Sequence, residues 1–122
     1  MTDTPTLTGV LADHVAAVNV FDEDAIVDTF ADDAFVDDAH REFWGIESIR
    51  RWVAKEMVGD KVTLKVTEVI DHYGDTIVRA KYDGDYNKTN LPSGDLIMSN
   101  YFTVRDGKIV SLIVIRNTPA DY

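Results

Sequence analysis

The sequence predicts an α+β domain in which three helices pack against one face of a curved antiparallel sheet. Two patterns lead to this prediction. Apolar residues recur at spacings of three and four before residue 60, and four runs rich in β-branched and aromatic residues follow it. Helices gathered ahead of a strand meander are typical of this class. A length of 122 residues fits one such unit, so we expect residues 1–122 to form a single domain.

Three helices are expected in the first half. Asp22 is a suitable N-cap for the second, short helix, and Gly59 is a suitable end for the third, which follows residues 44–45. A short strand is expected over residues 34–38. The apolar face of the first helix contains Leu7, Val10, Leu11, His14, Val15 and Val18.

Four strands are expected in the second half, at residues 62–70, 76–86, 96–104 and 109–115. Short glycine-containing segments at residues 73–75 and 105–108 separate two pairs of these strands and predict hairpins.

The charge distribution excludes several kinds of partner. The formal net charge is −10, and residues 1–40 contain ten acidic residues and no lysine or arginine. Such a surface repels phosphate backbones and anionic lipids, so nucleic-acid and membrane partners are not expected. The chain contains no cysteine and no apolar run of about 18 residues. Its first residues lack the basic flank and apolar stretch of a secretory signal, so we expect none. We expect a cytoplasmic protein.

Cofactor motifs are not found in the sequence. The three histidines lack the spacing of a zinc site, and no glycine-rich phosphate loop occurs. The segment that starts at Asp83 resembles a calcium loop, but Lys88 occupies the position that needs glycine. We therefore expect neither a metal ion nor an organic cofactor.

Three polar residues interrupt otherwise apolar faces. His14 lies in the stripe of the first helix, Asp38 shares a strand face with Val36, and Asn100 shares one with neighbours at spacings of two. A shift of one residue in register would place Ser99 on that face instead of Asn100. Each residue also has a structural interpretation: a satisfied core histidine, a turn or cap aspartate, and an asparagine bonded to the backbone.

These residues have a chemical use if they meet in an apolar hollow between helices and sheet. A carboxylate with two hydrogen-bond donors can remove a proton beside a carbonyl group and stabilise the resulting enolate. Arg41 is either a cation at the rim of the hollow or half of a surface ion pair. The expected pocket walls are Val18, Val36, Trp44, Tyr82, Tyr86, Met98 and Phe102.

Residues 15–19 (VAAVN) and 30–38 (FADDAFVDD) resemble the bacterial ketosteroid isomerases of the nuclear-transport-factor-2-like superfamily, whose SnoaL-like branch includes polyketide cyclases. Residues 45–50 and 106–110 resemble the start of the third helix and the last hairpin of that superfamily. The resemblance covers nearly the whole chain and implies a cystatin-like cone. It places Asp38 at the position of the general base. His14 falls where the family has an oxyanion-hole tyrosine, and Asn100 falls where it has a protonated aspartic acid.

The resemblance implies an isomerase or a cyclase that acts on a small apolar carbonyl compound. Asp38 would abstract the proton, while His14 and Asn100 would bind the oxyanion. Two alternatives remain: a non-catalytic module that binds ligands or forms dimers, and a dehydratase or hydrolase that uses an Asp38–His14 dyad. The resemblance also implies a homodimer formed through the outer face of the sheet, where we expect Ile97, Tyr101, Ile113 and Ile115.

Overall fold

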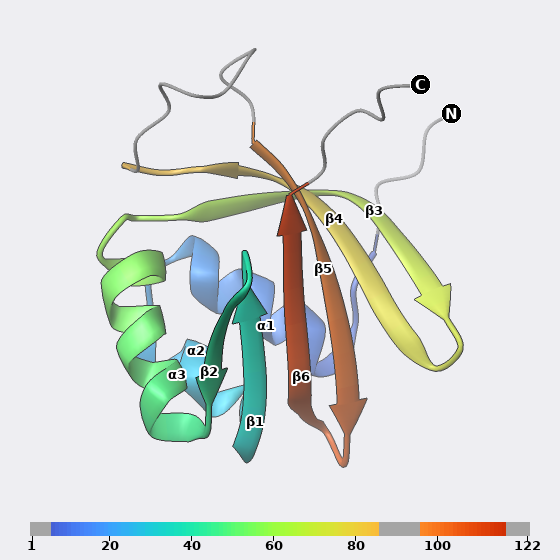
Figure 1. The fold of residues 1–122 in the computed structure, drawn as a ribbon. Coiled ribbons are helices and arrows are strands. Elements are labelled where there is room, and N and C mark those ends of the chain that lie inside the picture. The colour runs from blue at the N-terminus through green and yellow to red at the C-terminus, as the bar shows by residue number, and fades with distance from the viewer. Residues whose placement is uncertain (1–5, 86–95, 117–122) are drawn as a thin grey trace.

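The computed structural model describes residues 6–85 and 96–116, and in them confirms the α+β architecture (Figure 1). The helices lie together on the concave side of a curved sheet, as the sequence predicts. In chain order, the elements are α1 (Gly9–Asn19), α2 (Glu23–Asp28), β1 (Phe30–Asp38), β2 (Arg41–Trp44), α3 (Ile46–Trp52), the π-helical turn η1 (Val53–Val58), β3 (Thr63–His72), β4 (Asp75–Asp83), β5 (Leu96–Arg105) and β6 (Lys108–Arg116).

The sheet has the strand order β2-β1-β6-β5-β4-β3. All neighbours pair antiparallel except β1 and β6, so the predicted antiparallel sheet contains one parallel pairing. The chain passes through α3 and four other strands between β1 and β6, so no hairpin dictates their relative direction. Irregular registers in β3, between Val66 and Glu68, and in the β5–β6 pair, between Thr103 and Val104, are features that bend a sheet.

The helix termini follow the local sequence signals. The Asp22 side chain accepts a hydrogen bond from the backbone N–H of Ala25 at 3.1 Å, which confirms the predicted N-cap of α2. The helical segment that begins with α3 continues through η1 and ends before Gly59.

Strand β2 is absent from the sequence prediction. It forms a hairpin with β1 through Ala39 and His40, which have φ values of 53° and 68°. Two consecutive positive φ angles are typical of the tightest hairpin turns, and glycine or asparagine normally signals them. Neither residue occurs here, so the turn has no recognisable signature.

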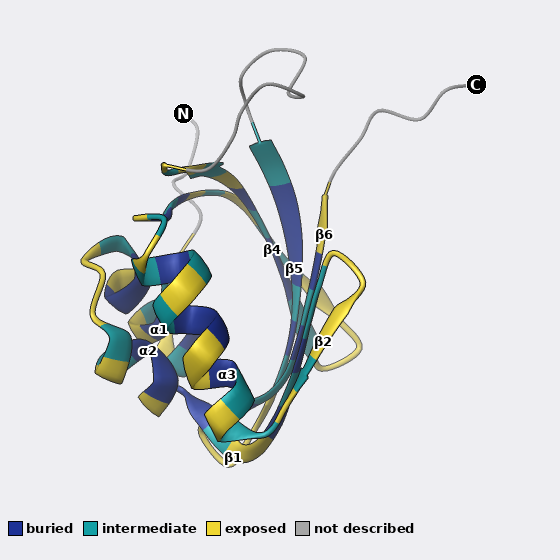
Figure 2. Ribbon diagram, turned by 60° about the vertical axis from the view of Figure 1, so that its left-hand side comes forward, coloured by how far each residue is buried: buried dark blue, intermediate teal, exposed yellow. Residues whose placement is uncertain are grey.

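The core fills the space between the helices and the concave face of the sheet (Figure 2). Asn100 lies on this face together with Met98 and Phe102, whereas Ser99 is buried on the opposite face beside Arg79. Val104, near the end of β5, is 38% exposed, although it pairs with the buried Ile109. No helix in the described ranges is long and apolar enough to span a membrane.

Candidate functional site

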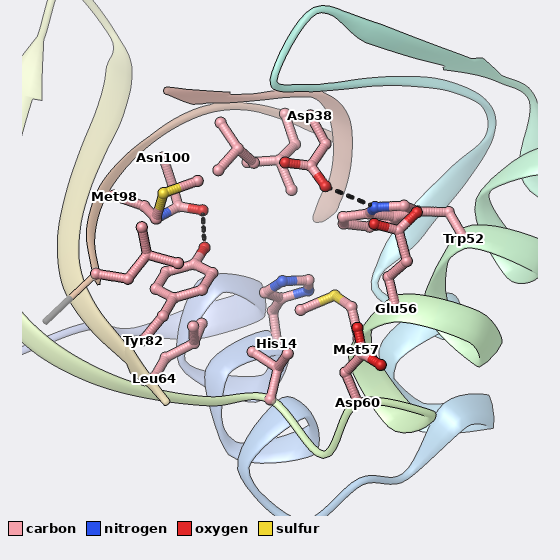
Figure 3. Close-up of a pocket in the computed structure, with 14 residues that line it drawn as sticks. His14, Asp38, Trp52, Glu56, Met57, Asp60, Leu64, Tyr82, Met98 and Asn100 are labelled. Atoms are coloured by element: carbon pink, nitrogen blue, oxygen red, sulfur yellow. Dashed lines mark hydrogen bonds between the residues drawn. The ribbon is translucent and has the colours of Figure 1, made fainter. Parts of the chain in front are cut away.

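A cavity of about 150 Å³ opens between the helices and the concave face of the sheet (Figure 3). Engineered cavities of about this volume bind a molecule the size of benzene. The volume of this cavity therefore suits a single ring better than a fused four-ring system. The lining residues are His14, Asp38, Trp52, Glu56, Met57, Asp60, Val62, Leu64, Tyr82, Leu96, Met98, Asn100, Leu112 and Val114.

The three polar residues singled out in the sequence all line this one cavity, although they come from α1, β1 and β5. Strand alternation explains the inward direction of Asp38 and Asn100, and the apolar stripe of α1 brings His14 inward. The cavity is therefore where a site built from these residues has to lie.

Only some of the residues predicted to form the pocket walls line the cavity. Tyr82 and Met98 line the cavity, whereas Val18, Val36 and Phe102 are buried in the core and do not line it. Tyr86 lies outside the described residues.

The expectation for Trp44 is wrong. Its side chain is 63% exposed, and its ring lies 4.2 Å from that of Phe35, its cross-strand partner, which points away from the cavity. Phe35 alternates with the inward residues Ala34 and Val36, so its partner Trp44 also faces outward. The tryptophan of the cavity is Trp52.

Asp38 is held from one side only. Its Oδ2 atom accepts a hydrogen bond from Trp52 Nε1 at 3.0 Å and another from the Arg41 guanidinium at 2.9 Å. Its other oxygen, Oδ1, has no hydrogen-bond partner in the described part of the chain. Burial raises the pKa of Asp38 above its ordinary value; the hydrogen bond from Trp52 and the charge of Arg41 oppose this increase, and the charge of Glu56 adds to it. The carboxylate is therefore fixed in place and more basic than an exposed aspartate.

Arg41 connects two of the acidic side chains. Its guanidinium binds both oxygens of Glu56, at 2.8 and 2.7 Å, as well as Asp38. This pairing ties the β1–β2 hairpin to η1. Arg41 fits both of its predicted interpretations, because its side chain is half-exposed at the rim and also forms ion pairs.

His14 is fully buried, and its hydrogen bonds fix its tautomer. Its Nδ1 atom lies 3.0 Å from the Thr29 hydroxyl, which donates its only hydrogen to the Ile26 carbonyl. Nδ1 must therefore carry the hydrogen of the neutral ring, and Nε2 is left as an acceptor. Burial lowers the pKa of His14 to about 4, so the ring is neutral near pH 7. A neutral ring in this tautomer cannot donate from Nε2, so the expected role of His14 as an oxyanion donor has to be replaced by that of an acceptor.

Asn100 and Tyr82 form a second hydrogen-bonded pair. The amide nitrogen of Asn100 donates to the Val78 carbonyl at 3.1 Å, which fixes the orientation of the amide, and its Oδ1 accepts from the Tyr82 hydroxyl at 2.6 Å. One N–H of Asn100 is left without a partner among the described residues. This N–H is the donor that remains available to a ligand.

The cavity thus has two unlike sides, which Figure 3 shows facing each other. We call Asp38, Trp52, Glu56 and Asp60 the acidic wall, and Asn100 with Tyr82 the amide wall. Trp52, Glu56 and Asp60 are not among the residues predicted from the sequence, although their spacing of four residues places them on one face of a continuous helix.

Neither alternative to the proton-abstraction site is favoured by this geometry. No hydrogen bond joins Asp38 to His14 in the described structure, because each has other partners. The hollow is not filled by side chains, and Asp38 lines it rather than turning to solvent. No group of three His, Asp or Glu side chains within the described ranges is arranged to hold a metal ion.

No protein-family model and no curated protein sequence matches the chain. Solved structures do match it. A proposed polyketide cyclase from Sinorhizobium meliloti is 27% identical, with a TM-score of 0.77, over 89% of this chain and 95% of that one. The epoxide hydrolase/cyclase-like enzyme SalBIII, of pyran ring formation in salinomycin, is 22% identical, with a TM-score of 0.75, over 88% of each chain.

A third similar structure is a hypothetical protein from Catenulispora acidiphila with a ketosteroid isomerase-like fold, in complex with trimethylamine. It is 20% identical, with a TM-score of 0.73, over 90% of this chain and 86% of that one. The resemblance stated from the sequence is thereby confirmed at the level of the fold. The chain has the nuclear-transport-factor-2-like fold, shared with ketosteroid-isomerase-like and polyketide-cyclase-like proteins.

Proposed function

We propose that the protein is an isomerase or cyclase that removes a proton from the carbon beside the carbonyl group of a small, ring-sized compound. One observation supports this most strongly: Asp38 lines an apolar cavity with one oxygen held by Trp52 and Arg41 and the other free for a substrate. Desolvation, which raises its pKa, makes this carboxylate a stronger base than an exposed aspartate. The polyketide cyclase and epoxide cyclase descriptions of similar structures agree with a ring-forming or isomerising reaction.

In the proposed reaction, Asp38 Oδ1 takes the proton, and the electron pair of the C–H bond forms the C=C bond of an enolate. The negative charge moves to the carbonyl oxygen, which receives the remaining N–H of Asn100. The Tyr82 hydroxyl donates to Asn100 Oδ1 and so polarises this N–H. Where a C=C bond adjoins the deprotonated carbon, the resulting dienolate takes the proton back from Asp38 at the far carbon of that bond, which moves the double bond. Where a second carbonyl group is in reach, the enolate carbon attacks it to close a ring, and the resulting alkoxide takes the proton from Asp38.

Hydrogen exchange tests this proposal without knowledge of the natural substrate. Cyclohexanone in heavy water provides the probe, and nuclear magnetic resonance measures deuterium uptake beside its carbonyl group. We expect the protein to accelerate uptake and Asp38→Asn to reduce the acceleration by about 100-fold to 10,000-fold, the usual contribution of a general base.

Asp33→Asn is the matched control, because Asp33 is an exposed acid on the same strand. It should leave exchange unchanged. Equal exchange by wild type and Asp38→Asn, with both proteins folded by circular dichroism, contradicts the proposal. Binding of cyclohexanone without any exchange supports a non-catalytic ligand-binding module instead.

We also propose that a second copy of the chain covers the outer face of the sheet. Trp44 and Ile115 are exposed on this face, 63% and 49%, and Phe35, Tyr101 and Ile113 lie between or beside them on paired strands. Contiguous apolar surface of this kind usually marks an interface. Light scattering at micromolar concentration should give the mass of a dimer, and the mass of a monomer contradicts this proposal.

A further inference from the structure

The polar groups of the cavity are mostly hydrogen-bond acceptors. His14 Nε2, Asp38 Oδ1 and the carboxylates of Glu56 and Asp60 accept, whereas the N–H of Trp52 is already donated to Asp38. On the amide wall, the Tyr82 hydroxyl is donated to Asn100, which leaves one amide N–H. A ligand that fills this cavity has to supply donors, because acceptors on the ligand would meet acceptors on the protein.

His14 makes this requirement strict. The residue is only 1% exposed, so the protein encloses almost all of its ring. No described residue donates to Nε2, yet no buried side-chain nitrogen or oxygen in the described structure lacks a partner, so Nε2 reaches the surface of the cavity. A buried acceptor of this kind is costly to leave unpaired when a ligand displaces water from it.

The cavity also carries negative charge. Asp38, Glu56 and Asp60 line it, and none of the described lining residues is lysine or arginine. Arg41 stands beside the cavity and compensates Asp38 and Glu56, but it does not bind Asp60. Within residues 6–85 and 96–116, the Asp60 carboxylate has neither an ionic nor a hydrogen-bonding partner.

We propose that the ligand of this cavity carries a positively charged amino group, which donates into this acceptor set and is paired with Asp60. This inference deepens the proposed function and rests on it for the other end of the ligand, the carbonyl group at the amide wall. The acidic wall then rejects anions: a carboxylate or phosphate on the ligand would lie against Asp60 in a partly desolvated site. Asp60 is in this account the residue that determines charge specificity.

Three ring-sized probes of different charge test the inference by binding alone. They are cyclohexylammonium, cyclohexanol and cyclohexanecarboxylate, and calorimetry measures their affinities at low salt and neutral pH. We expect the ammonium to bind about tenfold or more tighter than the alcohol, as a charge-assisted hydrogen bond provides, and the carboxylate not to bind. Added salt should reduce the preference.

Asp60→Asn should bring the affinities of the ammonium and the alcohol to within about twofold of each other, because it keeps the shape of the side chain and removes its charge. Asp71→Asn makes the same change in net charge at an exposed position of β3 and should leave the preference intact. Equal binding of ammonium and alcohol by wild type, no binding of the ammonium at millimolar concentration, or an unchanged preference in Asp60→Asn overturns the inference.

These outcomes are separate from those of the proposed function. Deuterium uptake by cyclohexanone and its loss in Asp38→Asn report on proton abstraction, which does not require Asp60. Exchange that persists without an ammonium preference therefore overturns only the inference. An ammonium preference without exchange leaves the charge specificity standing and overturns only the proposed reaction.

Discussion

The acidic wall and the amide wall of the cavity satisfy their polar groups in different ways. On the acidic wall, the Arg41 guanidinium, which is about half exposed, pairs with the charges of Asp38 and Glu56 but not with that of Asp60. On the amide wall, neutral groups satisfy one another, and Asn100 is fixed by Tyr82 and the Val78 carbonyl. On the acidic wall, Asp38 can gain or lose a proton, whereas the amide wall presents the fixed dipole of Asn100.

Because of this difference, substitutions in the two walls should have different effects on the measured reaction. Substitutions on the acidic wall should change the pH dependence of proton transfer, because Asp38 responds to the charges around it. Substitutions on the amide wall should change the rate at every pH. The predictions below use this contrast, in order of decreasing expected effect.

After Asp38→Asn, the largest effect is expected for Asn100→Leu. Removing the donor to the developing oxyanion should lower the rate of deuterium uptake by about 100-fold to 1,000-fold, with no shift of the pH profile. Ser99→Ala, which changes the neighbouring residue on the opposite face of β5, is the control and should retain the rate. A larger loss in Ser99→Ala than in Asn100→Leu contradicts the assignment.

The second effect concerns stability and His14. The pKa of His14 is lowered from 6.5 to about 4 in the folded protein, so the folded state binds fewer protons than the unfolded state between these values. The free energy of unfolding should therefore fall as pH falls through this window, by up to about 3 kcal/mol from this group.

Chemical denaturation at several pH values measures the effect of His14. The slope between pH 6.5 and 4 should flatten in His14→Gln and persist in His72→Gln, where the histidine is exposed. The pKa of Asp38 is raised, so this group contributes in the opposite direction: its stabilisation is lost as pH rises. Comparison of wild type with the two variants isolates the contribution of His14 to the slope. An unchanged slope in His14→Gln contradicts the prediction.

A smaller effect is expected for Arg41→Gln. Arg41 lowers the pKa of Asp38 and compensates Glu56, whose charge raises it. Without Arg41, the pKa of Asp38 should rise, so the acidic limb of the exchange profile moves to higher pH. Arg50→Gln removes a comparable ion pair, with Glu23 and Asp24, away from the cavity. The exchange profile of Arg41→Gln should therefore lie at higher pH than that of Arg50→Gln. Equal profiles would show that Arg41 does not lower the pKa of Asp38.

The smallest effect on the rate is expected from the outer face of the sheet. Tyr101→Glu places a charge in the proposed dimer interface, opposite to the face that lines the cavity. Light scattering should show a monomer, while deuterium uptake per chain stays the same. A dimer that persists in this variant argues against the interface, and a lost rate would show that the two faces are coupled.

The sequence was sufficient to predict much of the architecture and the centre of the site. Alternation along the strands correctly turns Asp38 and Asn100 inward, because both lie in regular stretches of β1 and β5. The parallel pairing of β1 with β6 could not be predicted, since it joins segments far apart in the chain.

The remaining details of the site depend on three-dimensional contacts. The outward direction of Trp44 could not be predicted, because the turn before the short strand β2 has no sequence signal. The tautomer of His14 depends on Thr29, fifteen residues away, whose hydroxyl is committed to a helix carbonyl. No periodicity in the sequence contains that information.

The pH profile of deuterium uptake by cyclohexanone tests the central claim most directly. We predict that uptake in the presence of wild type rises with pH through an inflection above 3.8, the ordinary pKa of an aspartate, and that Asp38→Asn abolishes this rise. A profile that is the same in both proteins would show that Asp38 is not the base.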